Sequence, residues 1–299
     1  MKLENVQLNL DTELVLNVGD PIGKTNAPRC YNTLFERLNM NAIMLPCEIK
    51  KGQLPQLLDA CHLMGIHYLC PTMPHKGDFV DLLDDVDETS RLFHSVNAIR
   101  MDDQGSHGAG MDGKGAVKAM LAGGAKLDGV SALLYGAGGI SGVVAYELAR
   151  HNVKKIYLAN RTREKAEAIA RLLRENTAAE AEVIDTAAAA LDRAAEQCEL
   201  FANLTPLGMK GFAQKHDYLG FVDRLPKTAT VFDCIINPPL SETIQAARRN
   251  GLNTVPGMQM LVAQMDVIFA FLFGKTITDA DKQACIQELC RFLGVSADF

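Results

Sequence analysis

The chain has 299 residues, of which 48% are hydrophobic and 22% charged, and its formal net charge is −6. Its length exceeds the usual size of one domain, so we expect two domains, each with enough apolar residues for a core. The acidic balance and the lack of a strongly basic block argue against nucleic acid as a partner.

The sequence also argues against a membrane, a metal and secretion. The apolar stretches at residues 130–149 and 258–273 are interrupted by glycines and by polar side chains, whereas a span across about 30 Å of hydrocarbon takes about 20 predominantly apolar residues. The opening MKLEN carries an early acid and no apolar core, which argues against a signal peptide. The eight cysteines stand at irregular spacings without a C-x-x-C pair, which predicts free thiols, no metal site and a cytoplasmic location.

The first third of the chain alternates predicted strands with predicted helices. Strands are expected at residues 13–18, 41–46, 68–70 and 96–100, and helices at residues 31–38 and 53–64. This alternation predicts a parallel or mixed α/β sheet. The turn-rich residues 19–28 and the proline-containing residues 71–78 each follow a strand, at the place where open α/β sheets bind ligands.

A strand, a glycine turn and a helix open the second predicted domain. Residues 129–134 are largely apolar, residues 135–142 read YGAGGISG, and apolar residues then recur at helical spacing. This pattern predicts the first βα unit of a Rossmann domain, in which Gly136 permits the tight turn and Gly138 lets the backbone approach a pyrophosphate. The third glycine of the G-x-G-x-x-G pattern is replaced by Ser141. A glycine turn without a ligand is the alternative.

The residues after the next strand favour NADP over NAD as the cofactor. A strand is predicted at residues 154–159, and an NAD site usually has an acidic residue at its end for the ribose 2′-hydroxyl. This chain instead has Asn160, followed by Arg161, Arg163 and Lys165. A carboxylate would repel a 2′-phosphate, whereas a guanidinium pairs with it through two hydrogen bonds. The alternative interpretation of Arg161 and Arg163 is a solvated basic start of a helix.

The remaining elements complete the second domain and the C-terminus. Strands are predicted at residues 182–184, 200–203 and 230–236, and helices at residues 186–196, 241–250, 257–273 and 279–293. Residues 203–209 end a strand and are expected to lie beside the cofactor.

The chain contains a series of different short motifs in a defined order. They are GDPI at 19–22, TMPHK at 72–76, VN at 96–97, DG at 112–113, GAGG at 136–139 with NRT at 160–162, and MLVAQ at 260–264. Through these motifs, and over essentially its whole length, the sequence resembles the shikimate/quinate dehydrogenases. The resemblance implies two α/β domains: residues 1–111 for the substrate, residues 112–254 for NADP, and C-terminal helices at 255–299 that pack back on the first domain.

The resemblance implies reversible hydride transfer between C4 of the nicotinamide and a ring alcohol, as between shikimate and 3-dehydroshikimate in aromatic amino acid biosynthesis. It makes Lys76 the catalytic acid/base and Asp112 its catalytic partner; an exposed loop lysine and a helix cap are the alternatives. The implied substrate-binding residues are Thr25, Ala27, Thr72, Asn97 and Gln264. The implied cofactor-binding residues are Gly136, Ala137, Gly138, Gly139, Asn160, Arg161, Thr162, Lys165, Thr205, Met209 and Gly257.

Several residues depart from the family's pattern. Two serines that hold the substrate carboxylate are replaced by Thr25 and Ala27, a tyrosine by Ile236, and the asparagine that precedes the aspartate motif by Gly110. Each lost hydrogen bond to a charged group costs about 1.5–3 kcal/mol, so we expect shikimate to bind roughly 10- to 100-fold or more weakly. Lys24 stands where the family often has histidine, and its ammonium is a candidate replacement; a solvated loop lysine is the alternative.

Three functions therefore remain open. The first is an NADP-dependent dehydrogenase that acts on shikimate. The second is a paralogue that acts on quinate or on another cyclic polyhydroxy acid. The third is a regulator that senses NADP without turnover, which would need neither Lys76 nor Asp112. In the first two cases the partner is a small-molecule cyclic hydroxy acid, and both a monomer and a homodimer are compatible with the sequence.

Overall fold

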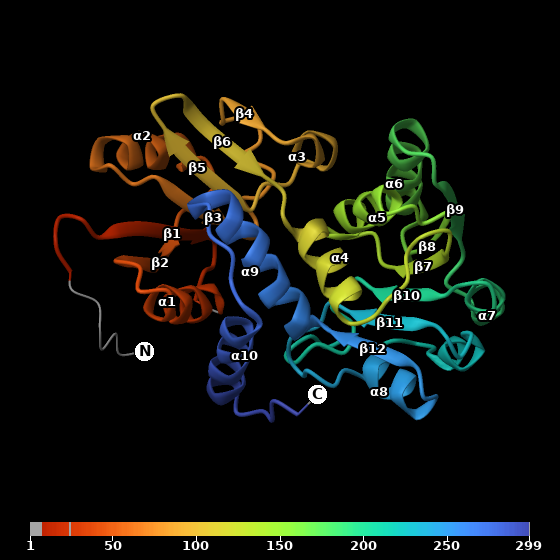
Figure 1. Ribbon diagram of the computed structural model, residues 1–299. Helices are drawn as coiled ribbons and strands as arrows, with labels where there is room; N and C mark the ends of the chain where they lie inside the picture. Colours follow the sequence, from red (N-terminus) through yellow and green to blue (C-terminus); the bar gives the residue numbers. More distant parts are fainter. Residues whose placement is uncertain (1–7, 24, 299) are drawn as a thin grey trace. The chain divides into compact units, whose positions relative to one another are not determined.

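The computed structural model describes residues 8–23 and 25–298 (Figure 1). The chain divides into two compact units, one made of Met1–Met111 with Met265–Ala297 and the other of Asp112–Gln264 with Asp298–Phe299. The described residues form two six-stranded sheets. Parallel strands and helices alternate along the chain in both units, which confirms the predicted α/β class with two domains.

The sheet of the first unit is mixed. Its strands are β1 (Glu13–Gly19), β2 (Ala42–Glu48), β3 (Tyr68–Pro71), β4 (Asp85–Val86), β5 (Ala98–Asp102) and β6 (Gly105–Ala109), in the spatial order β2-β1-β3-β5-β6-β4. Strands β2, β1 and β3 are parallel, whereas β5 runs antiparallel to both β3 and β6. The carboxyl ends of the three parallel strands therefore meet at one edge, where Gly19 and Pro71 lead into the two loops expected to bind substrate.

Helices cover this sheet through apolar side chains. They are α1 (Ala27–Arg37), α2 (Leu54–Met64), α3 (Glu88–Phe93), α10 (Asp279–Leu293) and the later turns of α9 (Gly257–Phe273). Helix α1 begins four residues before the expected start at Tyr31, because Pro28 in its first turn has the backbone angle of a helix and needs no N–H donor there. Leu54 and Cys61 of α2 join a buried cluster with Leu69 and Ile99 of the sheet.

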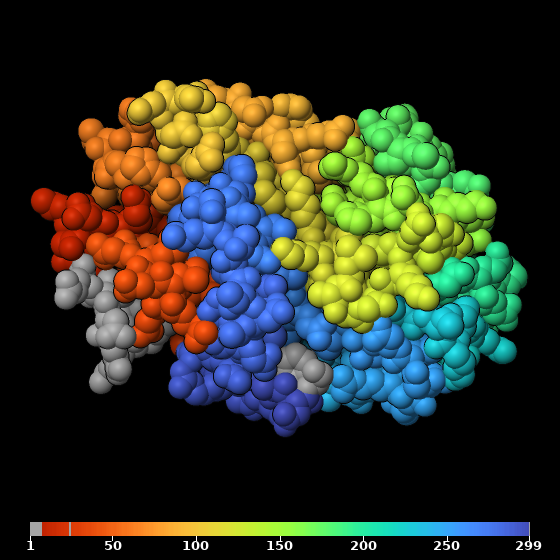
Figure 2. Space-filling view, in the orientation of Figure 1, coloured from red at the N-terminus to blue at the C-terminus, as the bar shows by residue number. Residues whose placement is uncertain are grey.

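A group of aromatic rings joins the C-terminal residues to the first unit. Phe269 lies 5.4 Å from Tyr31 and 5.6 Å from Phe35, centroid to centroid, and Phe273 lies 4.8 Å from Tyr68. Such pairs contribute about 0.5–1.5 kcal/mol each beyond the burial of their area. Figure 2 shows the residues of α10 in dark blue beside the red-orange residues of the first unit. The C-terminal helices are thus part of the core of this unit.

The sheet of the second unit is entirely parallel. Its strands are β7 (Ser131–Tyr135), β8 (Lys155–Ala159), β9 (Glu180–Ile184), β10 (Leu200–Asn203), β11 (Thr230–Asp233) and β12 (Asn253–Pro256), in the order β12-β11-β10-β7-β8-β9. This is the strand order of a Rossmann domain, and it confirms that prediction. The order reverses between β7 and β10, which is where such sheets bind a dinucleotide.

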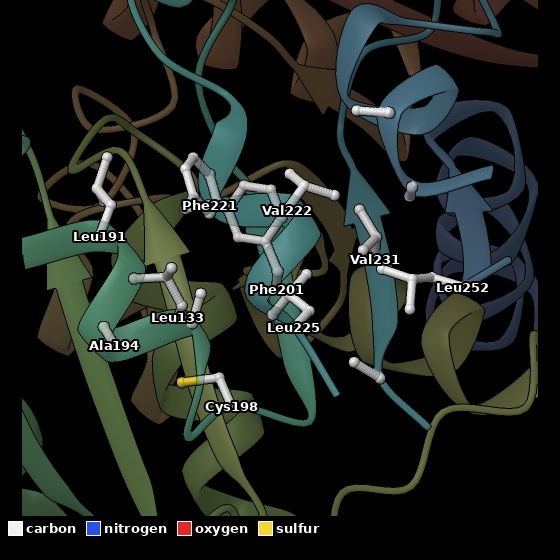
Figure 3. Close-up of a cluster of buried hydrophobic side chains, with 14 of the residues drawn as sticks. Leu133, Leu191, Ala194, Cys198, Phe201, Phe221, Val222, Leu225, Val231 and Leu252 are labelled. Carbon is white, nitrogen blue, oxygen red and sulfur yellow. The ribbon is translucent and has the colours of Figure 1, made fainter. Parts of the chain in front are cut away.

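The second unit has helices on its sheet and a core rich in phenylalanine. The helices are α4 (Asp112–Ala122), α5 (Ser141–Arg150), α6 (Arg163–Asn176), α7 (Ala188–Ala195), α8 (Glu242–Arg249) and the first turns of α9. Phe201 and Phe221 meet edge to face at 4.9 Å, with Leu133 and Val231 of neighbouring strands close by (Figure 3). This core supports the strands whose carboxyl ends line the cofactor pocket described below.

Two glycines let helix α4 approach its neighbours closely within the second unit. A Cβ atom on Gly113 would overlap the carbonyl of Val143 in α5. A Cβ atom on Gly115 would lie 2.6 Å from both Cα and Cβ of Gln264 in α9. The first turn of α4 therefore packs directly against the backbone of α9, and Gln264 lies beside Asp112.

Two further observations concern the cysteines and the membrane. All eight cysteines are free thiols, and burial raises the pKa of several of them, that of Cys198 to about 12. Over the described ranges, no helix combines the length and the apolar character that crossing a bilayer requires.

We predict that Gly115→Ala destabilises the protein. A glycine in a helix interior costs about 1 kcal/mol relative to alanine, so the change would normally stabilise α4. Here the added methyl group meets the backbone of α9, and overpacking of this kind costs about 1–3 kcal/mol or more. Urea unfolding should show a lower free energy of unfolding than for the wild type.

The control is Gly139→Ala, measured without dinucleotide. No atom lies within 4 Å of a Cβ placed there, so its effect should stay within about 0.5 kcal/mol. A more stable Gly115→Ala protein would contradict the close packing of α4 on α9.

Candidate functional site

A pocket of about 580 Å³ lies at the reversal point between β7 and β10 in the second unit. Eight of the residues expected to bind the cofactor line it: Gly136, Ala137, Gly138, Asn160, Arg161, Thr162, Lys165 and Thr205. Three others are not among its lining residues. Gly139 is exposed beside the turn, Met209 is exposed on the following loop, and Gly257 is buried at the start of α9.

The glycine turn after β7 has the geometry that close approach to a phosphate requires. Gly136 has φ of +117°, and a Cβ atom there would lie 2.7 Å from Cγ2 of Thr205 and 3.0 Å from the carbonyl oxygen of Leu204. Gly138 and Gly139 face open space instead, since a Cβ atom on either would have no neighbouring atom within 4 Å. The turn therefore packs on one wall of the pocket and leaves its other side open to a ligand.

Two polar side chains hold this turn in place. Ser141, which replaces the third glycine, is buried, and its hydroxyl accepts a hydrogen bond from the N–H of Gly138 at 3.0 Å. Asn160 accepts a hydrogen bond from the N–H of Ala137 at 3.0 Å and donates one to the carbonyl of Thr162 at 2.7 Å. The asparagine thus links the loops after β7 and β8 without adding a negative charge to the pocket.

The basic residues after β8 do not all face the pocket. Arg163 pairs with Glu167 at 3.0 Å and donates to the carbonyl of Val183 at 3.3 Å, so its guanidinium is used within the unit. Arg161 and Lys165 line the pocket and are exposed. Arg163 is not among the residues that line the pocket, and its contacts are those of a basic residue at the start of a helix.

The pocket also contains residues that the sequence analysis missed. They are Thr186, Phe212, Gln214, Lys215 and Asp217. Leu204, Pro206 and Leu207 also line the pocket and belong to residues 203–209, which were expected beside the cofactor, and Tyr135 opens the glycine turn. Lys215 pairs with Glu242 at 2.6 Å, and hydrogen bonding to that carboxylate raises the pKa of the lysine. Residues 210–219 form an irregular loop with no periodic pattern, so no sequence signal placed them at the pocket.

A buried carboxylate lies at the end of β11, next to the strand that leads into the pocket. Asp233 is fully buried and accepts hydrogen bonds from Nδ2 of Asn203 at 3.1 Å, from the N–H of Ile235 at 2.9 Å and from Oγ of Ser241 at 2.6 Å. Burial raises the pKa of Asp233 to about 6, although these hydrogen bonds act in the opposite direction.

In the first unit, the loops after β1 and β3 lie against each other. The N–H of Thr72 donates to the carbonyl of Val18 at 2.8 Å, and the N–H of Asp20 donates to the carbonyl of Met73 at 3.2 Å. A Cβ atom on Gly19 would lie 2.7 Å from Cγ2 of Thr72. Close backbone contact therefore places the two predicted substrate loops side by side.

The hydroxyl of Thr25 is bound to a buried amide. It donates to Oδ1 of Asn17 at 2.7 Å and accepts the N–H of Ala27 at 3.4 Å. Asn17 in turn donates through Nδ2 to the carbonyl of Cys70 at 2.8 Å. The Thr25 hydroxyl therefore already donates its hydrogen bond to a group of the protein. Ala27 has no hydroxyl. Lys24 lies outside the described residues.

Lys76 follows a tightly held histidine. The ring of His75 is buried, with Nε2 2.7 Å from the carbonyl of Ile49 and Nδ1 3.4 Å from Asp78. The carbonyl of Lys76 accepts the N–H of Val96 at 2.9 Å, so the backbone at this position is fixed to the start of the next predicted motif. The Lys76 residue is half-buried.

Asn97, which follows Val96, is buried, and its Oδ1 accepts the N–H of Met111 at 2.7 Å. Gly110 is tightly packed: a Cβ atom there would lie 2.8 Å from the carbonyl oxygen of Ser95 and 3.1 Å from Oγ of Ser90. The asparagine that the family has at this position would therefore require the backbone of this chain to move.

In the second unit, Gln264 donates a short hydrogen bond through Nε2 to Oδ1 of Asp112. Asp112 is buried in the first turn of α4, and Gln264 is half-buried on α9. Two predicted site residues 152 positions apart are thus in direct contact. Across the part of the chain that the structure describes, no cluster of three or more histidine, cysteine or acidic residues is arranged to hold a metal ion.

Two family models match different parts of the chain. Residues 18–99 match the family model described as the shikimate dehydrogenase substrate binding domain, and residues 132–207 match that of the saccharopine dehydrogenase NADP binding domain. The chain is 30% identical over 262 residues to the shikimate dehydrogenase (NADP(+)) of Alkaliphilus oremlandii (strain OhILAs), an alignment that covers 87% of this chain and 91% of that protein.

Solved structures show the same fold. A shikimate dehydrogenase in complex with NADP+ is 27% identical with a TM-score of 0.82, covering 94% of this chain and 97% of that one. The ligand-free 5-ketofructose reductase of Gluconobacter sp. strain CHM43 is 25% identical with a TM-score of 0.83, covering 95% of this chain and all of that one (100%).

We predict that Asp233 makes stability fall as the pH rises from about 4 to about 6. Its pKa of about 6 lies above the ordinary value of 3.8, so in this window the folded chain keeps a proton that the unfolded chain has lost. The difference between the two pKa values corresponds to roughly 3 kcal/mol. Asp233→Asn should remove this contribution.

The measurement is the free energy of unfolding of both proteins from pH 4 to pH 7. The difference between wild type and Asp233→Asn should change with pH between 4 and 6 and stay constant above 6. A difference that does not vary with pH would mean that Asp233 titrates alike in the folded and unfolded chains.

Proposed function

The chain belongs to the shikimate dehydrogenase family, and from this membership we propose that it is an NADP(H)-dependent oxidoreductase acting on a cyclic polyhydroxy acid. The reaction is hydride transfer between the cofactor and a ring hydroxyl or ketone, with shikimate and 3-dehydroshikimate as the representative pair. The observation that carries the proposal is the pocket at the reversal point of the Rossmann sheet, which eight residues of the expected cofactor set line.

The residues of this pocket fit NADP. The open side of Gly138 and Gly139 leaves room for a pyrophosphate, and Arg161 and Lys165 supply positive charge at the end of β8, where the 2′-phosphate is bound in this fold. Asn160 supports this assignment because it occupies the place of the acidic residue typical of NAD sites. When bound, NADPH supplies the hydride.

On the substrate side, Lys76 acts as the general acid in reduction and the general base in oxidation. In reduction, the carbonyl carbon gains the hydride, and the ammonium of Lys76 gives a proton to the carbonyl oxygen, which becomes the hydroxyl. The resemblance makes Asp112 the acidic partner in this proton transfer, and its carboxylate accepts a hydrogen bond from a neighbouring substrate hydroxyl. The hydrogen bond from Gln264 supports this role, because it holds the carboxylate of Asp112 in one orientation.

A second candidate is a paralogue with an altered substrate, such as quinate or a ketone without a carboxylate. Three features favour it: Ala27 lacks a hydroxyl, the proton of Thr25 is used by Asn17, and Gly110 is packed too tightly for an asparagine. The similarity to 5-ketofructose reductase supports it as well, since 5-ketofructose is a sugar ketone with no carboxylate. A panel of shikimate, quinate and neutral ketoses, followed at 340 nm, distinguishes the candidates by kcat/KM.

We predict that Lys76→Met lowers kcat about 10²- to 10⁴-fold on the best substrate of this panel, because the proton donor is lost. The Kd for NADPH should not change, since Lys76 belongs to the substrate loops. Lys51→Met is the control, because Lys51 is an exposed lysine of the same unit, paired at 3.7 Å with Asp78. An active Lys76→Met protein would refute the catalytic role, and NADPH binding without turnover of any panel member would favour the regulator.

We also predict that Arg161→Ala combined with Lys165→Ala raises the KM for NADP about 10- to 100-fold, the loss expected for charged hydrogen bonds to one phosphate. The KM for NAD should change little, since NAD lacks the 2′-phosphate. Arg163→Ala is the matched control, because Arg163 is engaged with Glu167 and Val183. Equal effects on both cofactors would place the 2′-phosphate elsewhere.

A further inference from the structure

The second unit contains a chain of buried polar side chains joined by hydrogen bonds, and the proposed reaction does not use it. It begins at Asp233, at the carboxyl end of β11, and continues through Asn203, at the carboxyl end of the adjacent β10. Both side chains are fully buried, and a carboxylate in such a place is costly unless its hydrogen bonds are satisfied.

One arm of the chain is structural. Oδ2 of Asp233 accepts the hydroxyl of Ser241 at 2.6 Å, and the same hydroxyl oxygen accepts the N–H of Ile244 at 3.2 Å. Ser241 is the N-cap of α8, so this arm anchors the start of that helix to the sheet. Ser241 makes no hydrogen bond to Asn203 or Thr205, although the first residue of α8, Glu242, pairs with the pocket residue Lys215.

The other arm leads to the cofactor pocket. Oδ1 of Asp233 accepts Nδ2 of Asn203 at 3.1 Å. A carboxylate offers acceptors alone, so it holds the NH₂ group of the asparagine toward itself and leaves the amide oxygen facing the other way. That oxygen accepts both the hydroxyl of Thr205, at 2.7 Å, and the N–H of Thr205, at 3.2 Å.

Thr205 is held in one orientation at the wall of the pocket. Its hydroxyl donates to Asn203 and its oxygen accepts the N–H of Leu207 at 3.3 Å, which leaves its methyl group against the glycine turn. A Cβ atom on Gly136 would lie 2.7 Å from that methyl carbon. The orientation of Thr205 therefore sets the spacing between the glycine turn and the loop after β10, the two walls on either side of the reversal point.

We propose that Asp233 and Asn203 are positioning residues for the cofactor. The acid fixes the direction of the Asn203 amide. That amide fixes Thr205, so that the glycine turn and the loop after β10 stay far enough apart for a dinucleotide. Neither side chain is among the residues that line the pocket, so they act through Thr205. The inference rests on the proposed function for the identity of the cofactor.

The test is direct binding of NADPH, followed by its fluorescence, together with steady-state kinetics. Asp233→Asn can donate as well as accept, so it no longer holds the amide of Asn203 in one direction. We expect about a tenfold or greater rise in the Kd and KM for NADPH, the size of a coupling within one hydrogen-bond network, with kcat at saturating NADPH changed less than about threefold. Thr205→Val should raise the Kd similarly, and Asp233→Asn with Thr205→Val should raise it no further.

Ser241→Ala is the matched control, because it removes a hydrogen bond to the same carboxylate on the arm that leads to α8. It should lower the Tm and raise the Kd for NADPH much less than Asp233→Asn does, because Asn203 and Thr205 keep their hydrogen bonds. A rise in Kd as large as that of Asp233→Asn would mean that general loosening, and not the arm through Asn203, is responsible, and would overturn the inference.

Thr205→Val keeps the test decisive if Asp233→Asn does not fold. It retains a methyl group but loses the hydroxyl that Asn203 holds, so its Kd for NADPH should rise; an unchanged Kd would overturn the inference. An unchanged Kd for NADPH in Asp233→Asn would overturn the inference but not the proposed function. A wild-type protein that does not bind NADPH would overturn both the inference and the proposed function.

Discussion

The carboxyl ends of parallel strands are the constraint on which both candidate sites depend. Parallel strands run in the same direction, so their carboxyl ends and the loops that follow them lie at one edge of the sheet. In the first unit this edge brings together the loops after β1 and β3, and in the second unit the loops after β7, β8 and β10. Residues far apart in the sequence become neighbours there because the strands, and not the loops, determine where the loops start.

Close backbone contact at these edges is made possible by small residues and stabilised by side-chain amides. Gly19 and Gly136 each face a threonine of the neighbouring loop at a distance that leaves no room for a side chain. Asn17, Asn160 and Asn203 then link these loops to each other or to the end of a neighbouring strand, since an amide can donate and accept at once. Three buried or half-buried asparagines thus provide the hydrogen bonds that the loop backbones cannot provide for themselves.

The two halves of the proposed reaction differ in how far they follow the family pattern. The cofactor half keeps its turn and its cations, and the replacement of a glycine by Ser141 adds a hydrogen bond that holds the turn. The substrate half keeps Lys76, Asn97 and Asp112 but lacks a hydroxyl at Ala27 and has Gly110 packed against the carbonyl of Ser95. This pattern retains the groups proposed for hydride and proton transfer, while it changes those that the resemblance assigns to binding a carboxylate.

Several features were predictable from the sequence because they depend on local chemistry. Alternating apolar segments predicted the α/β class and two domains, and the glycine turn with Asn160 and Arg161 predicted a dinucleotide site with a preference for NADP. Helices α9 and α10 begin and end at the expected residues. In α10 the capping box of Thr278 with Asp281 and the glycine at position 294 are local signals for the two ends.

Other features were decided by the tertiary structure alone. The pairing of Arg163 with Glu167 and Val183, the use of the Thr25 proton by Asn17, and the chain from Asp233 to Thr205 all depend on which groups the fold brings within hydrogen-bonding distance. The later part of the loop after β10, residues 210–219, contributes to the pocket although it has no periodic pattern. Sequence determines which hydrogen-bonding groups and turn-forming residues are present, whereas the partner of each group depends on distances between strands that only the packed sheet establishes.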